Sequence, residues 1–146
     1  MTGRGRPGPA GAAAGRVAAG RVSHGVPRLL PMDTRKAAQR WADVWQRGWR
    51  EHDAAAITAL YAEGAFWQQD PFREPEAGYL TRVFTEEESC ECQFDKPIVD
   101  GDQAAVRWSA RTRLANGESE NLAGVSLLRF NSSGLVVEHL DFSVFG

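Results

Sequence analysis

Apolar residues follow two different periods in the chain beyond Met32. Between Asp33 and Glu87 they recur mostly at three- and four-residue steps, which is the spacing of one helix face. Beyond Ser89 they alternate with polar residues, a pattern typical of strands that bury one side. Helical segments followed by consecutive strands predict an α+β domain, with helices packed on one face of an antiparallel sheet.

The helical part is predicted to begin with a long helix at Asp33 or Thr34, either of which can cap the first turn. One stripe of this helix is strongly aromatic and is expected to pack in the core, although part of it could line a pocket. The stripe consists of Ala38, Trp41, Trp45 and Trp49. A second, short helix is predicted from Asp53, with its apolar residues, Tyr61 among them, facing inward.

A short strand is predicted over Ala65–Gln69, and a third helix over Glu76–Glu87. Between them, Asp70-Pro71 indicates a bend in the chain. Asp70 could simply initiate that turn, or it could lie at the lip of an apolar cavity, where the loss of water would raise its pKa. The acidic run Glu86–Glu88 is expected to form a solvated helix end.

Four strands are predicted after the helices, joined by turns that contain Asp, Asn and Gly. They are expected at residues 90–99, 103–114, 122–130 and 135–145. The second strand alternates most regularly. Its apolar face is expected to contain Trp108 together with Ala104, Val106, Ala110 and Leu114.

Residues 1–31 differ in composition from the rest of the chain. They are rich in Gly, Ala, Arg and Pro, contain five arginines and no acid, and are expected to be disordered. Met32 is favoured as the true start, which would leave one compact domain over residues 32–146. Because the whole chain has a net charge of −2, that domain carries −7. An acidic domain without a basic stripe argues against a nucleic-acid partner.

No apolar run is long enough to cross a membrane, so no membrane partner is expected. Cys90 and Cys92 lie two residues apart on one predicted strand, with parallel side chains, and are not expected to form a disulfide. Two reduced thiols favour a cytoplasmic location. The chain has no His/Cys cluster with metal-site spacing and no phosphate-binding loop, so neither a metal nor another cofactor is expected.

The order of the predicted elements resembles that of a known superfamily. The elements are a helix, a second helix from Asp53 to Leu60-Tyr61, a short strand, Asp70-Pro71-Phe72, Gly78, a helix and four strands. Over Asp33–Phe145 this order resembles the nuclear transport factor two-like superfamily, which includes ketosteroid isomerases and SnoaL-like polyketide cyclases. The resemblance implies a strongly curved sheet that forms a cone-shaped α+β barrel with the helices around a mostly apolar pocket. It also implies a homodimer through the outer face of the sheet.

In ketosteroid isomerases the general base is an Asp immediately before a Pro, and Asp70 matches that position. Those enzymes also need two acidic hydrogen-bond donors for the enolate oxygen, whose positions correspond here to Trp45 and Ser126. An indole cannot replace a phenol in this role, and a serine hydroxyl is a weaker donor than a carboxylic acid. Steroid isomerisation is therefore not expected, because the largest catalytic contribution would be missing.

SnoaL-like cyclases place an acid–base Asp on the last strand, in a segment that Val137-Glu138-His139-Leu140-Asp141 resembles. His139 and Asp141 alternate onto one face of the predicted strand together with Val137, while Val136 falls on the other face. If the face with His139 is concave, both residues enter the cavity and either could move a proton. Near the end of a sheet they could instead simply face water.

Two kinds of function remain open at this point. One is cofactor-free proton transfer, of cyclase, isomerase or dehydratase type, on a small apolar cyclic or polyketide-like substrate. Asp70 or Asp141 would be its base, with His139 orienting or donating. The other is a non-catalytic ligand-binding or dimeric interaction module of the same fold. The pocket wall is expected to consist of Trp41, Trp45, Phe66, Trp67 and Trp108, with Ser126 beside them.

Overall fold

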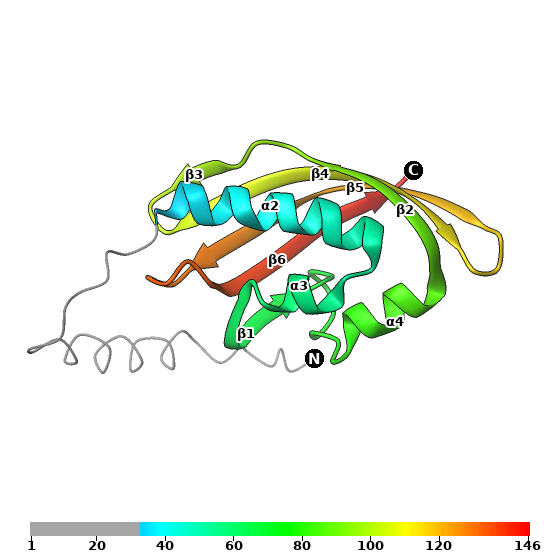
Figure 1. Cartoon of the computed structure of the whole chain (residues 1–146), viewed down its shortest axis with the longest axis horizontal. Helices are drawn as coiled ribbons and strands as arrows, with labels where there is room; N and C mark the ends of the chain where they lie inside the picture. The colour runs from blue at the N-terminus through cyan, green and yellow to red at the C-terminus, as the bar shows by residue number, and fades with distance from the viewer. Residues whose placement is uncertain (1–32) are drawn as a thin grey trace, which may run out of the picture. The chain divides into compact units, whose positions relative to one another are not determined.

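A computed structural model describes residues 33–146, and the predictions for residues 1–31 and for a start at Met32 lie outside the described residues. The described part folds into one domain of helices and strands (Figure 1). In chain order the elements are α2 (Thr34–Glu51), α3 (Ala54–Thr58), β1 (Tyr61–Gln68), α4 (Tyr79–Glu86), β2 (Glu87–Phe94), β3 (Ile98–Asp100), β4 (Gln103–Leu114), β5 (Ser119–Phe130) and β6 (Val136–Phe145).

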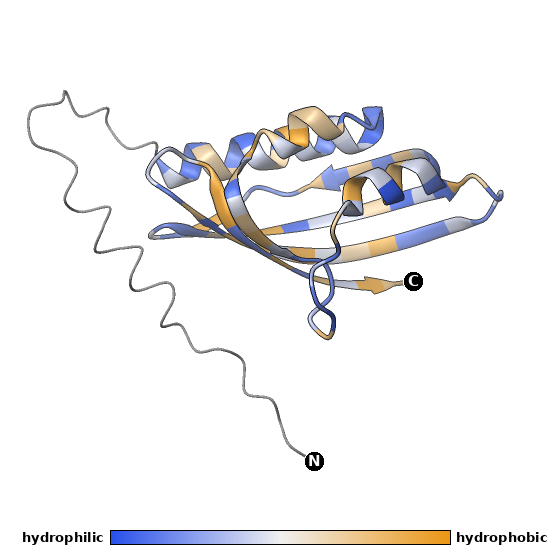
Figure 2. Cartoon of the chain, turned by 90° about the horizontal axis from the view of Figure 1, so that it is seen from below, coloured by the Kyte–Doolittle hydropathy of each residue, from blue (hydrophilic) through white to orange (hydrophobic). Residues whose placement is uncertain are grey.

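The strands form one mixed sheet in the order β1-β6-β5-β4-β2, with β3 paired to β4. Only the β1–β6 pair is parallel, and the other pairs in this sheet are antiparallel. The sheet is curved and the helices lie on one side of it (Figure 2). The α+β class is confirmed. The sheet is not closed, because within the described residues its edge strands β1 and β2 do not pair with each other.

Helix α2 begins where Asp33 accepts a hydrogen bond from the backbone N–H of Arg35 at 2.7 Å. Its aromatic stripe is buried, as predicted, and joins the core of the domain. The helix crosses α3 closely at Gly48, where an added Cβ would lie 2.9 Å from the Ile57 side chain. Glycine at this position therefore permits the contact that fixes α3 against α2.

Strand β4 has the alternation that the sequence predicts, and it places Trp108 on the inner face of the sheet. Trp108 pairs with Gly124 of β5 in the register of the sheet. An added Cβ at Gly124 would lie 2.9 Å from the Trp108 ring and 2.6 Å from the Phe142 carbonyl oxygen. The absence of a side chain at Gly124 thus leaves room for the indole on the concave face.

Several element boundaries predicted from the sequence are wrong. The strand predicted over residues 90–99 is two strands, β2 and β3, so five strands follow the helices and not four. Strand β5 begins at Ser119 rather than at Leu122, and α4 begins at Tyr79 rather than at Glu76.

Two further differences bear on the site. Strand β1 begins at Tyr61 rather than at Ala65, and Gly64, with φ of 73°, interrupts its regular pairing with β6. Helix α4 ends at Glu86, so that Glu87 is the first residue of β2 and is only 7% exposed. The prediction that Glu87 belongs to a solvated helix end is therefore wrong, because the chain turns inward at that residue.

A bulge in β6 changes which residues share the inner face with His139. Phe130 pairs with Val136 and Arg129 pairs with Glu138, so Val137 is an extra residue opposite this step. As a result Val136 is fully buried on the same side as His139. The sequence-based assignment of Val137 to the His139 face, and of Val136 to the other face, is corrected.

Cys90 and Cys92 are both free thiols, as the sequence predicts. Among the helices of residues 33–146, none combines the length and apolar composition that a membrane crossing needs.

Candidate functional site

A pocket of about 600 Å³ lies between the concave face of the sheet, helices α2 and α4, and the loop after β1. Its interior is mostly aromatic, because the stripe of α2 faces the inward residues of β1, β2 and β4 across it. The interior aromatic residues are Trp41, Trp45, Trp49, Trp67, Phe94 and Trp108. The floor of the pocket on β5 and β6 contains polar groups, with Ser126, His139 and Asp141 as neighbours.

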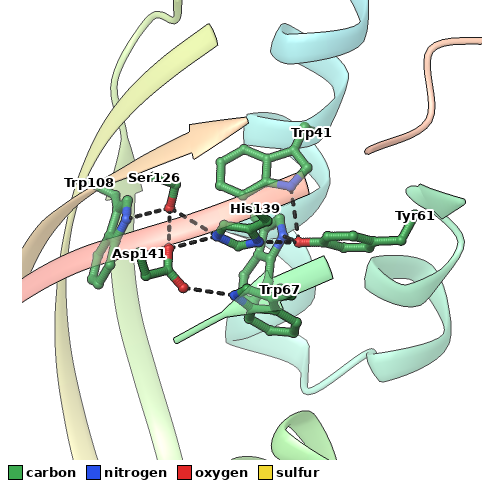
Figure 3. Close-up of polar contacts among 8 residues, drawn as sticks. Trp41, Tyr61, Trp67, Trp108, Ser126, His139 and Asp141 are labelled. Atoms are coloured by element: carbon green, nitrogen blue, oxygen red, sulfur yellow. Dashed lines mark hydrogen bonds and ion pairs between the residues drawn. The ribbon is translucent and has the colours of Figure 1, made fainter. Parts of the chain in front are cut away.

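The Asp141 carboxylate is the centre of a hydrogen-bond network on this floor (Figure 3). Its Oδ1 accepts hydrogen bonds from His139 Nε2 at 2.6 Å and from the Ser126 hydroxyl at 2.6 Å. Its Oδ2 accepts a third from Trp67 Nε1 at 2.9 Å. The Ser126 oxygen in turn accepts from Trp108 Nε1 at 3.0 Å. Three neutral donors from three strands thus hold one carboxylate.

His139 lies behind Asp141 and is 1% exposed. Its Nδ1 is 2.8 Å from the Tyr61 hydroxyl, which also lies 3.2 Å from Trp41 Nε1 and 3.1 Å from Trp45 Nε1. The two indoles can only donate, so they occupy both lone pairs of the Tyr61 oxygen. The Tyr61 proton must then go to His139 Nδ1, which leaves Nε2 as the N–H donor to Asp141. We therefore assign His139 as a neutral imidazole. Hydrogen bonds then run in one direction, from the Trp41 and Trp45 indoles to Tyr61, from Tyr61 to His139, and from His139 to Asp141.

The surroundings shift the pKa values of Asp141 and Tyr61 in opposite directions. Burial on its own would raise the pKa of Asp141. It is outweighed by the hydrogen bonds from His139, Ser126 and Trp67, so the pKa of Asp141 is lowered. Burial raises the pKa of Tyr61 well above its usual value, although the Trp41 and Trp45 indoles oppose it. Asp141 is therefore a stable anion, and Tyr61 stays a neutral donor.

A second carboxylate, Glu87, lines the pocket from the start of β2. Its Oε1 accepts one hydrogen bond, from Trp49 Nε1 at 2.8 Å, and lies 3.6 Å from His52 Nε2. Burial raises the pKa of Glu87 to about 7, because the single indole donor offsets only part of the lost hydration. This end of the pocket can therefore gain or lose a proton near neutral pH.

Asp70, the other base proposed from the sequence, lies at the rim of the pocket. Its side chain is 47% exposed, and Oδ1 accepts a hydrogen bond from the Phe72 backbone N–H at 2.8 Å. Its Oδ2 is 3.8 Å from Arg73 Nε. The carboxylate thus stabilises the turn and faces water, which is the simpler of its two predicted roles.

Four of the five residues expected in the pocket wall do line the pocket, namely Trp41, Trp45, Trp67 and Trp108. Phe66 does not, and the prediction that it belongs to the wall is corrected. Trp67 stacks on His139 with ring centroids 4.8 Å apart. Because successive strand residues point to opposite faces, Phe66 points outward, where it is 44% exposed. Ser126 is buried at the floor, where it donates to Asp141.

Sequence reasoning missed two polar residues of the site, Tyr61 and Glu87, and two aromatic residues of the pocket wall, Trp49 and Phe94. The family resemblance places a phenol on the first helix, at the position of Trp45, whereas in the structure Tyr61 of β1 supplies the phenol. The burial of Glu87 could have been suspected from its position, because it lies where the helical spacing of apolar residues changes to the alternation of a strand. At such a junction one residue of an acidic run can turn inward. Among residues 33–146, no three His, Cys, Asp or Glu side chains are grouped so as to hold a metal ion.

The chain belongs to the SnoaL-like domain family, whose sequence profile matches residues 38–139. No curated protein sequence matches the chain significantly. Among solved structures, it is similar to AclR, a putative hydroxylase from Streptomyces galilaeus, at 16% identity over 73% of this chain and 79% of that one, with a TM-score of 0.62. It is also similar to an LEH-like epoxide hydrolase of M. tuberculosis, at 11% identity over 77% and 86% of the two chains, with a TM-score of 0.63.

A third similar structure is a hypothetical protein with a ketosteroid isomerase-like fold from Catenulispora acidiphila, solved in complex with trimethylamine. It is 15% identical over 68% of this chain and 82% of that one, with a TM-score of 0.59. At these identities the likeness concerns the fold. Family and fold thus agree with the resemblance drawn from the order of the elements.

Proposed function

We propose that the domain binds a small, largely apolar, ring-bearing molecule in the pocket and transfers a proton at Asp141 without a cofactor. The observation that carries the proposal is the position of Asp141. It is a carboxylate at the floor of an aromatic pocket, 13% exposed at its side chain and backed by the Tyr61–His139 chain. Small-molecule sites are typically apolar cavities with a few convergent polar groups, and this pocket has that character.

The proton-transfer step is an abstraction next to a carbonyl group. Asp141 takes the proton of a C–H bond, and the electron pair of that bond moves onto the carbonyl oxygen to give an enolate. A carboxylate held by three donors is a weak base, so a suitable hydrogen must be acidic. Hydrogens between two carbonyl groups have that acidity, which favours a polyketide-like substrate over a simple ketone.

The similar structures support a small-molecule pocket in a general way. The names of two of them, a putative hydroxylase and an LEH-like epoxide hydrolase, describe enzymes, and a third was solved with trimethylamine bound. A non-catalytic ligand-binding module of the same fold is the alternative to turnover. The low basicity of Asp141 favours this alternative.

The proposal is tested by following hydrogen–deuterium exchange of cyclic 1,3-dicarbonyl compounds in D₂O by ¹H NMR. We expect the wild-type protein to accelerate exchange and Asp141→Asn to lower the accelerated rate at least about 100-fold. Asp70→Asn is the matched control, because it removes a pocket carboxylate that faces water, and it should leave the rate unchanged. Equal rates for wild type and Asp141→Asn would eliminate Asp141 as the base.

We further propose a homodimer through the outer face of the sheet. The support is a group of partly exposed apolar side chains that the strand register places on that face: Phe66, Leu127, Phe142 and Val144. Arg107, Arg111 and Arg113 of β4 could meet acids of the second copy. Sedimentation over a concentration series should give a dimer that Phe142→Asp converts to a monomer. The same change at Phe72, on the pocket rim, is the control.

A further inference from the structure

The negative charge of Asp141 has no cationic partner among residues 33–146. Its three hydrogen-bond donors are the indole of Trp67, the hydroxyl of Ser126 and the imidazole of His139, which the Tyr61 contacts leave neutral. These donors satisfy the carboxylate oxygens but supply no positive charge. A buried anion is normally paired with a cation, so the site is electrostatically incomplete without a ligand.

The walls around Asp141 are suited to a cation with an apolar surface. Trp67 contacts the carboxylate, and Trp45 meets Trp67 edge to face with ring centroids 5.6 Å apart. Trp49, Phe94 and Trp108 continue this aromatic wall along the pocket. The faces of aromatic rings, of tryptophan above all, attract organic cations, and several faces around one cavity form the recognised environment of alkylated ammonium groups.

The rim of the pocket does not supply the missing positive charge. Only two arginines line the pocket within the described part of the chain, Arg73 and Arg82. Arg82 bonds Glu76 and Glu86, and Arg73 lies beside Asp70. Both arginines are substantially exposed and are already next to acids. The field at the entrance therefore does not oppose the approach of a cation.

From these observations we propose that the ligand carries an N-alkylated ammonium group, and that this group lies against Asp141 between the tryptophan walls. The inference rests on the ligand-binding half of the proposed function and not on the proton transfer. A permanently charged group fits better than a primary amine. Its methyl groups make apolar contacts with the rings, and it has no N–H group that would compete with the three donors already bonded to Asp141.

The test compares two probes of nearly equal shape, choline and its uncharged analogue 3,3-dimethylbutan-1-ol. Binding is followed through the five indole N–H signals in ¹H–¹⁵N spectra of the full chain at constant ionic strength. We expect choline to shift the Trp67 signal and to bind at least about tenfold more tightly than the alcohol. Asp141→Asn should reduce this preference to near parity, whereas Asp70→Asn should preserve it.

The outcomes separate the two proposals, and the wild-type comparison remains decisive if Asp141→Asn does not fold. Equal binding of both probes would overturn the cation inference and leave the apolar pocket standing. No shift with either probe would count against the inference and the ligand pocket together. The ¹⁵N shifts of His139 supply an independent readout. A doubly protonated His139 would also overturn the inference, because Asp141 would then have its cation within the protein.

Discussion

Two carboxylates, Asp141 and Glu87, line one pocket, and their surroundings shift their pKa values in opposite directions. Asp141 accepts an indole N–H from Trp67 at 2.9 Å, and Glu87 accepts one from Trp49 at 2.8 Å. Each also has a histidine nearby. Yet the pKa of Asp141 is lowered, whereas that of Glu87 is raised to about 7.

The difference lies in the number of donors and not in burial, which favours the neutral acid at both positions. Asp141 receives two further hydrogen bonds of 2.6 Å, from Ser126 and His139. Glu87 receives none from His52, whose Nε2 is 3.6 Å away and has no hydrogen-bond partner among the described residues. Asp141, at one end of the pocket, therefore stays ionised, whereas Glu87, at the other end, titrates near neutral pH.

The largest expected effect comes from breaking the chain behind Asp141 with Tyr61→Phe. The change leaves the Trp41 and Trp45 N–H groups and His139 Nδ1 without partners. Three unsatisfied buried groups should lower the free energy of unfolding by about 3–5 kcal/mol, measured by urea denaturation. The matched control is Tyr79→Phe in the pocket wall, because the Tyr79 hydroxyl makes no hydrogen bond within residues 33–146. Similar losses in both variants would contradict the assigned chain.

A smaller loss is expected for Asp141→Asn, because the amide presents an N–H₂ group to one of the existing donors. We expect about 2–4 kcal/mol at pH 7, against less than about 0.5 kcal/mol for Asp70→Asn at the rim.

The lowered pKa of Asp141 also determines the pH range in which its ionisation stabilises the fold. The stabilisation is present above the unfolded value of 3.8 and is lost as the pH falls below it. The variant should not show this acid-side loss.

The pH dependence from Glu87 has the opposite sign. Its folded pKa of about 7 exceeds the unfolded value of 4.5, so the folded protein keeps a proton that the unfolded chain has released. Stability should therefore decrease between pH 4.5 and 7, by at most about 3 kcal/mol, and stay level above pH 7. Denaturation at several pH values should show this slope in the wild type and not in Glu87→Gln. An unchanged slope in the variant would assign it to another group.

The predicted elements that the structure confirms depend on local patterns. The stripe of tryptophans on α2 and the alternation of β4 are visible in any short window of the sequence, because each period reports one buried face. The SnoaL-like resemblance rests on the order of such elements. The shared face of His139 and Asp141 followed from the same alternation, but only the structure shows that this face lines the pocket. The bulge at Val137 still reversed the assignment of Val136, since a bulge has no fixed sequence signature.

The composition of the site depends on contacts between distant segments. Tyr61 and His139 are 78 residues apart, and Trp67 and Asp141 are 74 apart. They meet because β1 pairs in parallel with β6 at the sheet edge. No local period encodes that pairing. The sequence alone therefore gives helices, strands and two candidate aspartates. Only the folded sheet distinguishes Asp141 from Asp70 and brings Glu87 inside. The reason is that the pKa and burial of a side chain depend on neighbouring residues that are distant in the sequence.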